Sequence, residues 1–177
     1  MLAPRAQFVL ANTALAIAVP FMRATLIAVG ARMPRWVSEG YGEYAKRLSH
    51  DLPLQLVEIA AKPRGKNADV VRIMDEEAAA VLAAIPRGAH AVALDGRGRS
   101  FSSGQLAEQL ARWRMQGSDL AFLVGGPDGF NDAVLARAQQ VWSLGPATLP
   151  HPLVRIVVAE QLYRAMSLLN NHPYHRG

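Results

Sequence analysis

Strand-like and helix-like segments alternate along this sequence, and that alternation is the feature that most constrains its fold. Short apolar runs typical of buried strands are each followed by a stretch in which apolar residues recur at helical spacing. The predicted strands cover 25–30, 54–59, 91–96, 120–126 and 139–144. The predicted helices cover about 35–48, Val70 to just before Pro86, Ser102 or Ser103 through Trp113, 131–138, and Pro152 to about Asn170. This order predicts one α/β domain with a parallel sheet flanked by helices on both faces.

The bulk composition agrees with one folded domain. The chain has 177 residues, of which 51% are hydrophobic and 19% are charged, which is enough apolar sequence for a proper core. The absence of cysteine excludes disulfides, cysteine-ligated zinc, iron–sulfur clusters and thiol catalysis. The formal net charge of +5 suits a polyanionic partner such as nucleic acid.

The first 21 residues form an apolar leader that precedes the predicted fold. One arginine, Arg5, followed by an apolar run resembles a secretory signal, but the run is too short and too interrupted to span a membrane. The first predicted strand begins at Thr25, which leaves no spacer after a cleavage site. We therefore expect 1–21 to be a disordered extension or a misassigned start, and 22–177 to be a cytoplasmic domain that begins at Met22.

Three of the predicted strand ends carry unusual sequences. They are Leu94-Asp95-Gly96, the Gly-Gly-Pro-Asp-Gly segment at 125–129, and the stretch after Leu144. Ligands of open α/β sheets bind beyond the carboxyl ends of the strands, so these segments are candidates for a binding site. The segment at 125–129 lacks the Gly-Lys-Ser/Thr ending of a phosphate loop, and no Gly-x-Gly-x-x-Gly follows the first strand. The glycines could equally form a plain strand-to-helix turn.

The loop LGPATLP at 144–150 is stiff and uncharged. It offers main-chain N–H and C=O groups together with apolar side chains, which is the chemistry that grips a neutral heterocycle. A plain proline-stiffened connection is the alternative. His151, which follows the loop, could be a hydrogen-bonding residue at the start of the last helix or a catalytic one.

The C-terminal sequence NNHPYHRG at 170–177 is basic and aromatic. Together with Arg155 and Arg164 on the last predicted helix, it could stack on unpaired bases and contact phosphates. The alternatives are adventitious metal binding by the histidines and an ordinary solvated chain end.

Several long segments resemble one known family. SLGPATLPHPLVRIVVAEQLYRAMSLLNNHPYHRG, LVGGPDGF, KPRGKNAD and AVGARMPRWV are similar to the ribosomal RNA large-subunit methyltransferase H family, which belongs to the SPOUT class of knotted methyltransferases. The resemblance covers Met22 to Gly177. The length of the last segment and the Gly-Gly-Pro-x-Gly loop make it specific.

The resemblance implies features that periodicity does not. It implies a SPOUT-type α/β-knot, in which a deep C-terminal trefoil knot forms the site for S-adenosylmethionine, and a homodimer. The residues that it assigns to cofactor binding are Leu94, Gly125, Gly126, Leu144, Gly145, Pro146, Ala147, Thr148 and Leu149.

The resemblance also implies a reaction, which is methylation of nitrogen-3 of a pseudouridine in 23S ribosomal RNA on assembled ribosomes. We expect Tyr174, His175 and Arg176 to serve catalysis, and Arg155, His172 and Arg176 to bind RNA. The tail that holds most of them would complete the site of a partner chain. We expect no metal and no membrane association. The alternatives are a SPOUT methyltransferase acting on another RNA, such as tRNA, and a non-catalytic RNA-binding protein.

Overall fold

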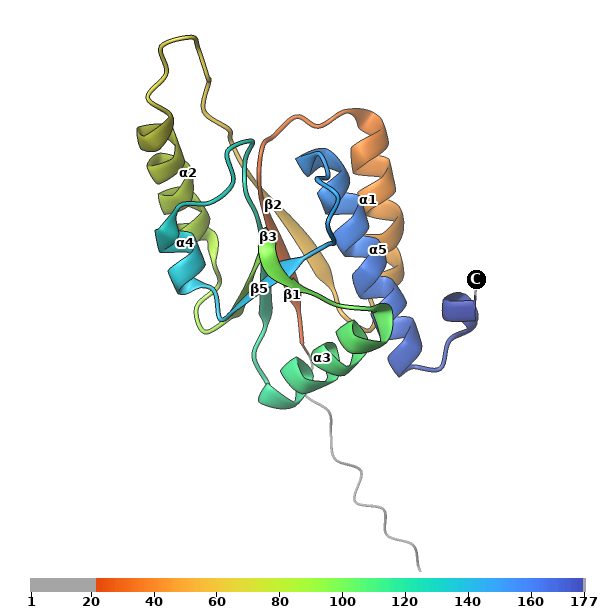
Figure 1. Ribbon diagram of the computed structural model, residues 1–177. Helices are drawn as coiled ribbons and strands as arrows, with labels where there is room; N and C mark the ends of the chain where they lie inside the picture. The colour runs from red at the N-terminus through yellow and green to blue at the C-terminus, as the bar shows by residue number, and fades with distance from the viewer. Residues whose placement is uncertain (1–21, 177) are drawn as a thin grey trace, which may run out of the picture.

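The computed structural model describes residues 22–176, so the extension expected at 1–21 lies outside the described residues. Five strands alternate with five α-helices and a final 3-10 helix (Figure 1). The strands are β1 (Ala24–Val29), β2 (Leu54–Ile59), β3 (His90–Ser100), β4 (Leu120–Val124) and β5 (Gln140–Ser143). The helices are α1 (Arg35–Leu48), α2 (Val70–Ala84), α3 (Ser103–Gln116), α4 (Asp132–Arg137), α5 (His151–Leu169) and η1 (Pro173–Arg176).

The five strands form one parallel sheet in the order β2-β1-β4-β3-β5. Every strand therefore ends at the same edge of the sheet, and the loops after β3, β4 and β5 leave from neighbouring positions. The predicted α/β class and parallel sheet are confirmed. This order also places the three unusual strand ends side by side.

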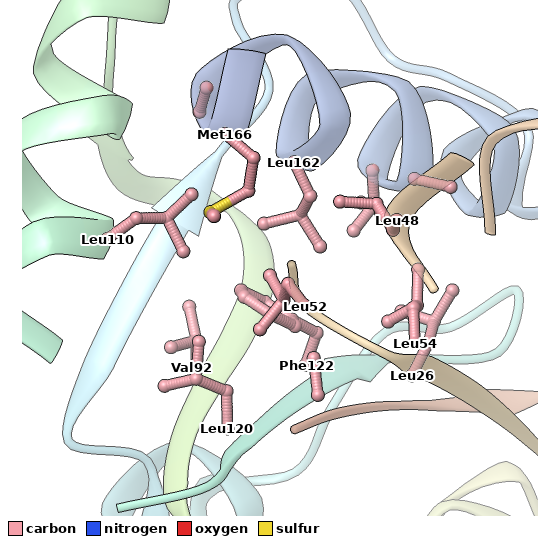
Figure 2. Close-up of a cluster of buried hydrophobic side chains, with 14 of the residues drawn as sticks. Leu26, Leu48, Leu52, Leu54, Val92, Leu110, Leu120, Phe122, Leu162 and Met166 are labelled. Carbon is pink, nitrogen blue, oxygen red and sulfur yellow. The ribbon is translucent and has the colours of Figure 1, made fainter. Parts of the chain in front are cut away.

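Helices cover both faces of the sheet because the side chains of the central strands alternate between two apolar clusters. On one face, Leu26, Val92 and Phe122 pack against α1, α3 and α5, as Figure 2 shows for part of this cluster. On the other face, Ile27 and Leu123 pack in the smaller cluster with α2 and α4. α5 contacts both α1 and α3 and so forms the middle of the larger layer.

Local sequence signals explain where several helices begin and end. Ser102 and Gln105 form a reciprocal capping box at the start of α3, and Gly117 ends that helix in the left-handed region at φ 71°. The Asp69 side chain accepts a hydrogen bond from the Arg72 N–H at the start of α2. Pro152 lies in the first turn of α5, where a missing N–H is tolerated.

β3 is longer than the sequence predicts. We expected the strand to end in a turn at Gly96, but it continues to Ser100 and pairs again with β5 after a register shift between Leu94 and Arg99. The glycines that suggested a turn instead allow an irregular strand. A Cβ atom on Gly98 would lie 2.6 Å from the Val141 carbonyl carbon, so only glycine permits this close approach. None of the described helices is both long enough and apolar enough to cross a bilayer.

Candidate functional site

A cavity of about 570 Å³ opens at the carboxyl ends of β3, β4 and β5 and at the start of α5. We call it the strand-end cavity. Its volume lies within the range of roughly 300–1,000 Å³ that is usual for small-molecule sites. Its lining consists of Leu94, Asp95, Gly96, Val124, Gly125, Gly126, Pro127, Gly129, Trp142, Ser143, Leu144, Gly145, Pro146, Ala147, Thr148, Leu149, Pro150, His151 and Val154.

All nine residues that were predicted to bind the cofactor line this one cavity. Sequence reasoning missed Trp142, Ser143 and Val154 as lining residues. Trp142 and Val154 resemble core residues at the end of a strand and in the first turn of a helix, so periodicity gave no signal for them. Ser143 had a weak signal in its position just before the glycine-containing loop.

Main-chain conformation shapes the cavity at two glycines. A Cβ on Gly125 would lie 2.9 Å from the Gly129 carbonyl carbon, so the loop 125–129 can fold back on itself only with glycine at this position. Gly145 has φ 128°, a conformation that other residues rarely adopt. The Ser143 Oγ holds this turn: it donates to the Gly145 carbonyl at 3.2 Å and accepts from the Gly145 N–H at 3.3 Å.

Two ionisable side chains line the strand-end cavity. Asp95 accepts two hydrogen bonds from the Arg97 guanidinium, at 2.8 and 2.9 Å, and these bonds hold the Asp95 pKa below its ordinary value. Partial burial lowers the pKa of His151, and the positive charges of Arg155 and Arg64 lower it further. At neutral pH the imidazole of His151 is therefore uncharged. The remaining walls are mainly apolar side chains and main-chain groups, with the hydroxyl side chains of Ser143 and Thr148 among them.

Arg155 does not lie where an RNA-binding residue would. Its side chain is 1% exposed, and its guanidinium donates to Glu58 Oε1 at 2.6 Å and to the Gly30 carbonyl at 2.6 Å. We had expected Arg155 to face RNA. The structure corrects this expectation, because a buried guanidinium that is already paired cannot contact phosphates. Arg155 instead ties α5 to the carboxyl ends of β1 and β2.

The C-terminal segment packs on α5 and α1 through aromatic and charged groups. The Tyr174 ring lies 4.7 Å from the Tyr163 ring between centroids, and the Arg164 guanidinium lies 5.0 Å from the Tyr174 ring. The Tyr174 hydroxyl donates to Glu160 Oε1 at 3.3 Å. Burial raises the Tyr174 pKa, and the Glu160 charge beside it has the same effect. The tail cluster, as we call it, consists of Tyr44, Arg47, Glu160, Tyr163, Arg164, His172 and Tyr174.

The tail cluster and the strand-end cavity lie at different places along α5. Val154 is the last residue of α5 that lines the cavity, whereas Glu160, which holds Tyr174, is six residues further along the helix. At 1.5 Å per residue, this separation is about 9 Å along the helix axis. Figure 1 shows the C-terminal segment beside the far end of α5. None of the tail side chains that the structure describes, up to Tyr174, lines the cavity of the same chain; the side chains of His175 and Arg176 lie outside the description.

The described side chains that could ligate a metal do not form a metal site. Within residues 22–176, no group of three or more histidine, aspartate or glutamate side chains converges in a way that could hold a metal ion. The strand-end cavity instead offers apolar walls, main-chain hydrogen-bonding groups and glycines that allow close approach. These are features of a site for an uncharged ring system.

Comparisons with known proteins agree on one family. The family model described as "Predicted SPOUT methyltransferase" matches residues 22–175. A protein of Hahella chejuensis named ribosomal RNA large subunit methyltransferase H is 56% identical over 88% of this chain and 99% of its own length. A protein of the same name from Xanthomonas campestris pv. campestris is 57% identical over 88% of this chain and all of its own length.

A solved structure supports the fold independently. The crystal structure of a probable methyltransferase from Bordetella pertussis matches 82% of this chain and 95% of its own length, with a TM-score of 0.54 and 16% identity. An identity this low supports the fold alone. The family match and the two close relatives carry the assignment further: the chain belongs to the SPOUT methyltransferase family and is a methyltransferase that uses S-adenosylmethionine.

Proposed function

We propose that this enzyme methylates nitrogen-3 of a pseudouridine in 23S ribosomal RNA, on assembled ribosomes in the cytoplasm. The observation that carries the proposal is that the predicted cofactor residues from three separate strand ends line a single cavity. The identity of 56–57% to relatives named for the large-subunit ribosomal RNA supports the choice of RNA. The pseudouridine and its nitrogen come from the family resemblance.

The chemistry of the strand-end cavity fits S-adenosylmethionine. Leu94, Leu144 and Leu149 supply apolar surface for the adenine ring, and the loops supply main-chain groups for its polar edge. A Cβ on Gly145 would meet no atom within 4 Å, so this turn borders open space rather than packed side chains. The uncharged His151 adds no positive charge that would repel a sulfonium. We assign the adenosine to the loops 125–129 and 144–149.

The protein's part in the reaction is mainly one of alignment. When bound, S-adenosylmethionine supplies an electrophilic methyl group on a positively charged sulfur. The chain holds the nucleobase so that nitrogen-3 faces that methyl group, and it stabilises the loss of the imide proton. We assign these roles to Tyr174, His175 and Arg176, with His172 contacting RNA beside them.

A homodimer reconciles these roles with the geometry. The tail cluster lies about 9 Å along α5 from the cavity of the same chain, so we propose that the tail of one protomer completes the cavity of its partner. The deep trefoil knot that the resemblance implies stays a prediction of the same proposal. A knotted loop would hold the segment 144–149 rigid without requiring charged side chains.

The decisive experiment is methyl transfer to purified substrates with isotope-labelled S-adenosylmethionine. We expect label in 23S RNA when the enzyme acts on assembled ribosomes, and mass mapping of RNA fragments should place it on a pseudouridine. Purified tRNA is the matched control and should stay unlabelled. Label in tRNA with none in ribosomal RNA would overturn the proposal in favour of a tRNA methyltransferase.

A further inference from the structure

Arg64 joins the loop between β2 and α2 to the loop that borders the strand-end cavity. Its Nη1 and Nη2 donate to the two carboxylate oxygens of Glu77 at 3.1 and 3.0 Å. Its Nε donates to Asp128 Oδ2 at 2.7 Å, and its Nη1 also donates to the Lys62 carbonyl at 3.0 Å. One guanidinium therefore links its own loop to α2 and to a loop that lies 64 residues away in the sequence. Asp128 lies within the cavity loop 125–129.

Glu77 is a charged residue in a buried position, where removal of its carboxylate from water costs free energy. It is 4% exposed, on α2, and besides Arg64 it accepts the Lys62 N–H at 2.9 Å. A buried carboxylate with good partners contributes little more to stability than an apolar residue of similar size would, but its fixed hydrogen bonds can define a geometry. The ion pair of Glu77 and Arg64 is therefore better explained by the geometry that its hydrogen bonds fix than by a contribution to the stability of the fold.

The ion pair lies beside Gly126 of the cavity loop. A Cβ placed on Gly126 would lie 3.1 Å from Glu77 Oε2 and 3.3 Å from Arg64 Nη2. The ion pair therefore borders the space that a side chain at this position would need, while Gly126 itself lines the strand-end cavity. An isolated bridge between Gly126 and Gly129 closes the loop over this support. Movement of the ion pair would move one wall of the cavity.

We propose that Arg64 and Glu77 are positioning residues for the methyl donor: they fix the loop 125–129 at the spacing that donor binding requires. This inference rests on the proposed assignment of the strand-end cavity to S-adenosylmethionine. Neither side chain lines the cavity, so both act through the main chain of the loop. Loss of their geometry should weaken donor binding while leaving the RNA-facing tail intact.

The chain offers a matched control on the same helix. Glu76 precedes Glu77 and forms exposed ion pairs with Lys62 and Arg72, and none of the three atoms nearest to a Cβ placed on Gly126 belongs to Glu76. E76Q and E77Q therefore remove the same charge from adjacent positions, one beside solvent and one beneath the cavity loop. R64K keeps the positive charge but cannot form the two-pronged contact with Glu77. D128N removes only the surface partner of Arg64.

The test is calorimetric binding of S-adenosylmethionine to the full chain and its variants, together with the KM for donor, the KM for ribosomes and kcat. We expect E77Q to raise the donor Kd at least tenfold, R64K and D128N to raise it several-fold, and E76Q to change it less than twofold. The donor KM should rise with the Kd, while the KM for ribosomes and kcat at saturating donor stay near the wild-type values. A uniform loss of Tm and kcat with unchanged donor Kd would indicate a purely structural pair and overturn the inference.

Two further outcomes separate this inference from the proposed function. If E77Q does not fold, R64K and D128N decide the matter, since Arg64 is partly exposed and Asp128 lies at the surface. Wild-type donor affinity in both of these variants would overturn the positioning role and leave the cavity assignment intact. A wild-type chain that binds no S-adenosylmethionine would overturn both.

Discussion

The strand-end cavity and the tail cluster share one helix but are built from different kinds of groups. The cavity is built from main-chain turns, glycines and apolar walls, and its one histidine is held uncharged. The tail cluster is built from tyrosine rings tilted against one another, two arginines and Glu160. The groups of the cavity are those that suit a small molecule, whereas rings and cations are those that suit unpaired RNA, as proposed above. The contrast indicates that the two regions can be disabled separately.

The largest effect should come from removing the tail. Truncation after Asn170 deletes Tyr174, His175 and Arg176 but no residue that lines the cavity. We expect methyl transfer to ribosomal RNA to fall by a factor of about 10² or more, because the nucleobase loses its alignment. Calorimetry should show an unchanged donor Kd. A parallel loss of donor binding would show that the tail supports the cavity and that the two regions cannot be disabled separately.

Mixing variants sharpens this test. A truncated chain and a chain with a defective cavity should each be inactive alone. If the tail of one protomer completes the cavity of its partner, co-expression of the two should restore part of the activity. Absence of any recovery, with mixed dimers shown to form, would mean that tail and cavity act within one chain.

A smaller effect, with the reverse pattern, should follow from Gly125→Ala. The added Cβ would lie 2.9 Å from the Gly129 carbonyl carbon, so the loop 125–129 must open. We expect the donor affinity to fall about tenfold, or about 1.4 kcal/mol, with RNA affinity unchanged in a filter-binding assay. Gly42→Ala on α1 is the control, because a Cβ there meets nothing within 4 Å. Equal losses in both variants would point to a general effect on folding.

The smallest effect should be a pH dependence of donor binding. The folded-state pKa of His151 lies below its ordinary value of 6.5, so the side chain is neutral in both states above that pH. As the pH falls below 6.5, the unfolded chain takes up the proton first, and the contribution of neutral His151 to stability is lost. Protonation of the folded chain then adds a positive charge beside a cationic donor.

Donor affinity should therefore be constant above pH 6.5 and should weaken as the pH falls below that value. H151Q should remove most of that decline in a calorimetric titration. His90, at the start of β3, also has a pKa lowered by burial, but it does not line the cavity. H90Q should change the pH dependence of stability without changing that of donor binding. An equal decline in wild type and H151Q would exclude His151 as the cause.

The sequence predicted the fold well because its signals are local. Apolar runs, helical spacing and proline or glycine punctuation placed all five strands and the helices between them to within a few residues. The exception was β3, which we expected to break at a turn after Gly96. Arg99 pairs with Trp142, which lies 43 residues later in the sequence, and a local pattern cannot show such a pairing.

The candidate site was predicted unevenly. The strand-end rule and the resemblance together nominated residues that do line one cavity. Arg155 was misjudged because its charge suggested exposure, and its partners Glu58 and Gly30 come from distant segments. The ion pair of Arg64 and Glu77, which lies beside the cavity loop, was not predicted for a similar reason. Long-range ion pairs leave no periodic trace in a sequence.

α5 serves both as a wall of the strand-end cavity, through His151 and Val154, and as the platform for the tail cluster, through Glu160 and Arg164. The length of α5 therefore fixes the position of the tail cluster relative to the cavity. One residue inserted between Val154 and Glu160 would turn the platform by about 100° and advance it by about 1.5 Å relative to the cavity. A change in the length of this stretch would therefore alter both the distance and the relative orientation of the cavity wall and the tail cluster.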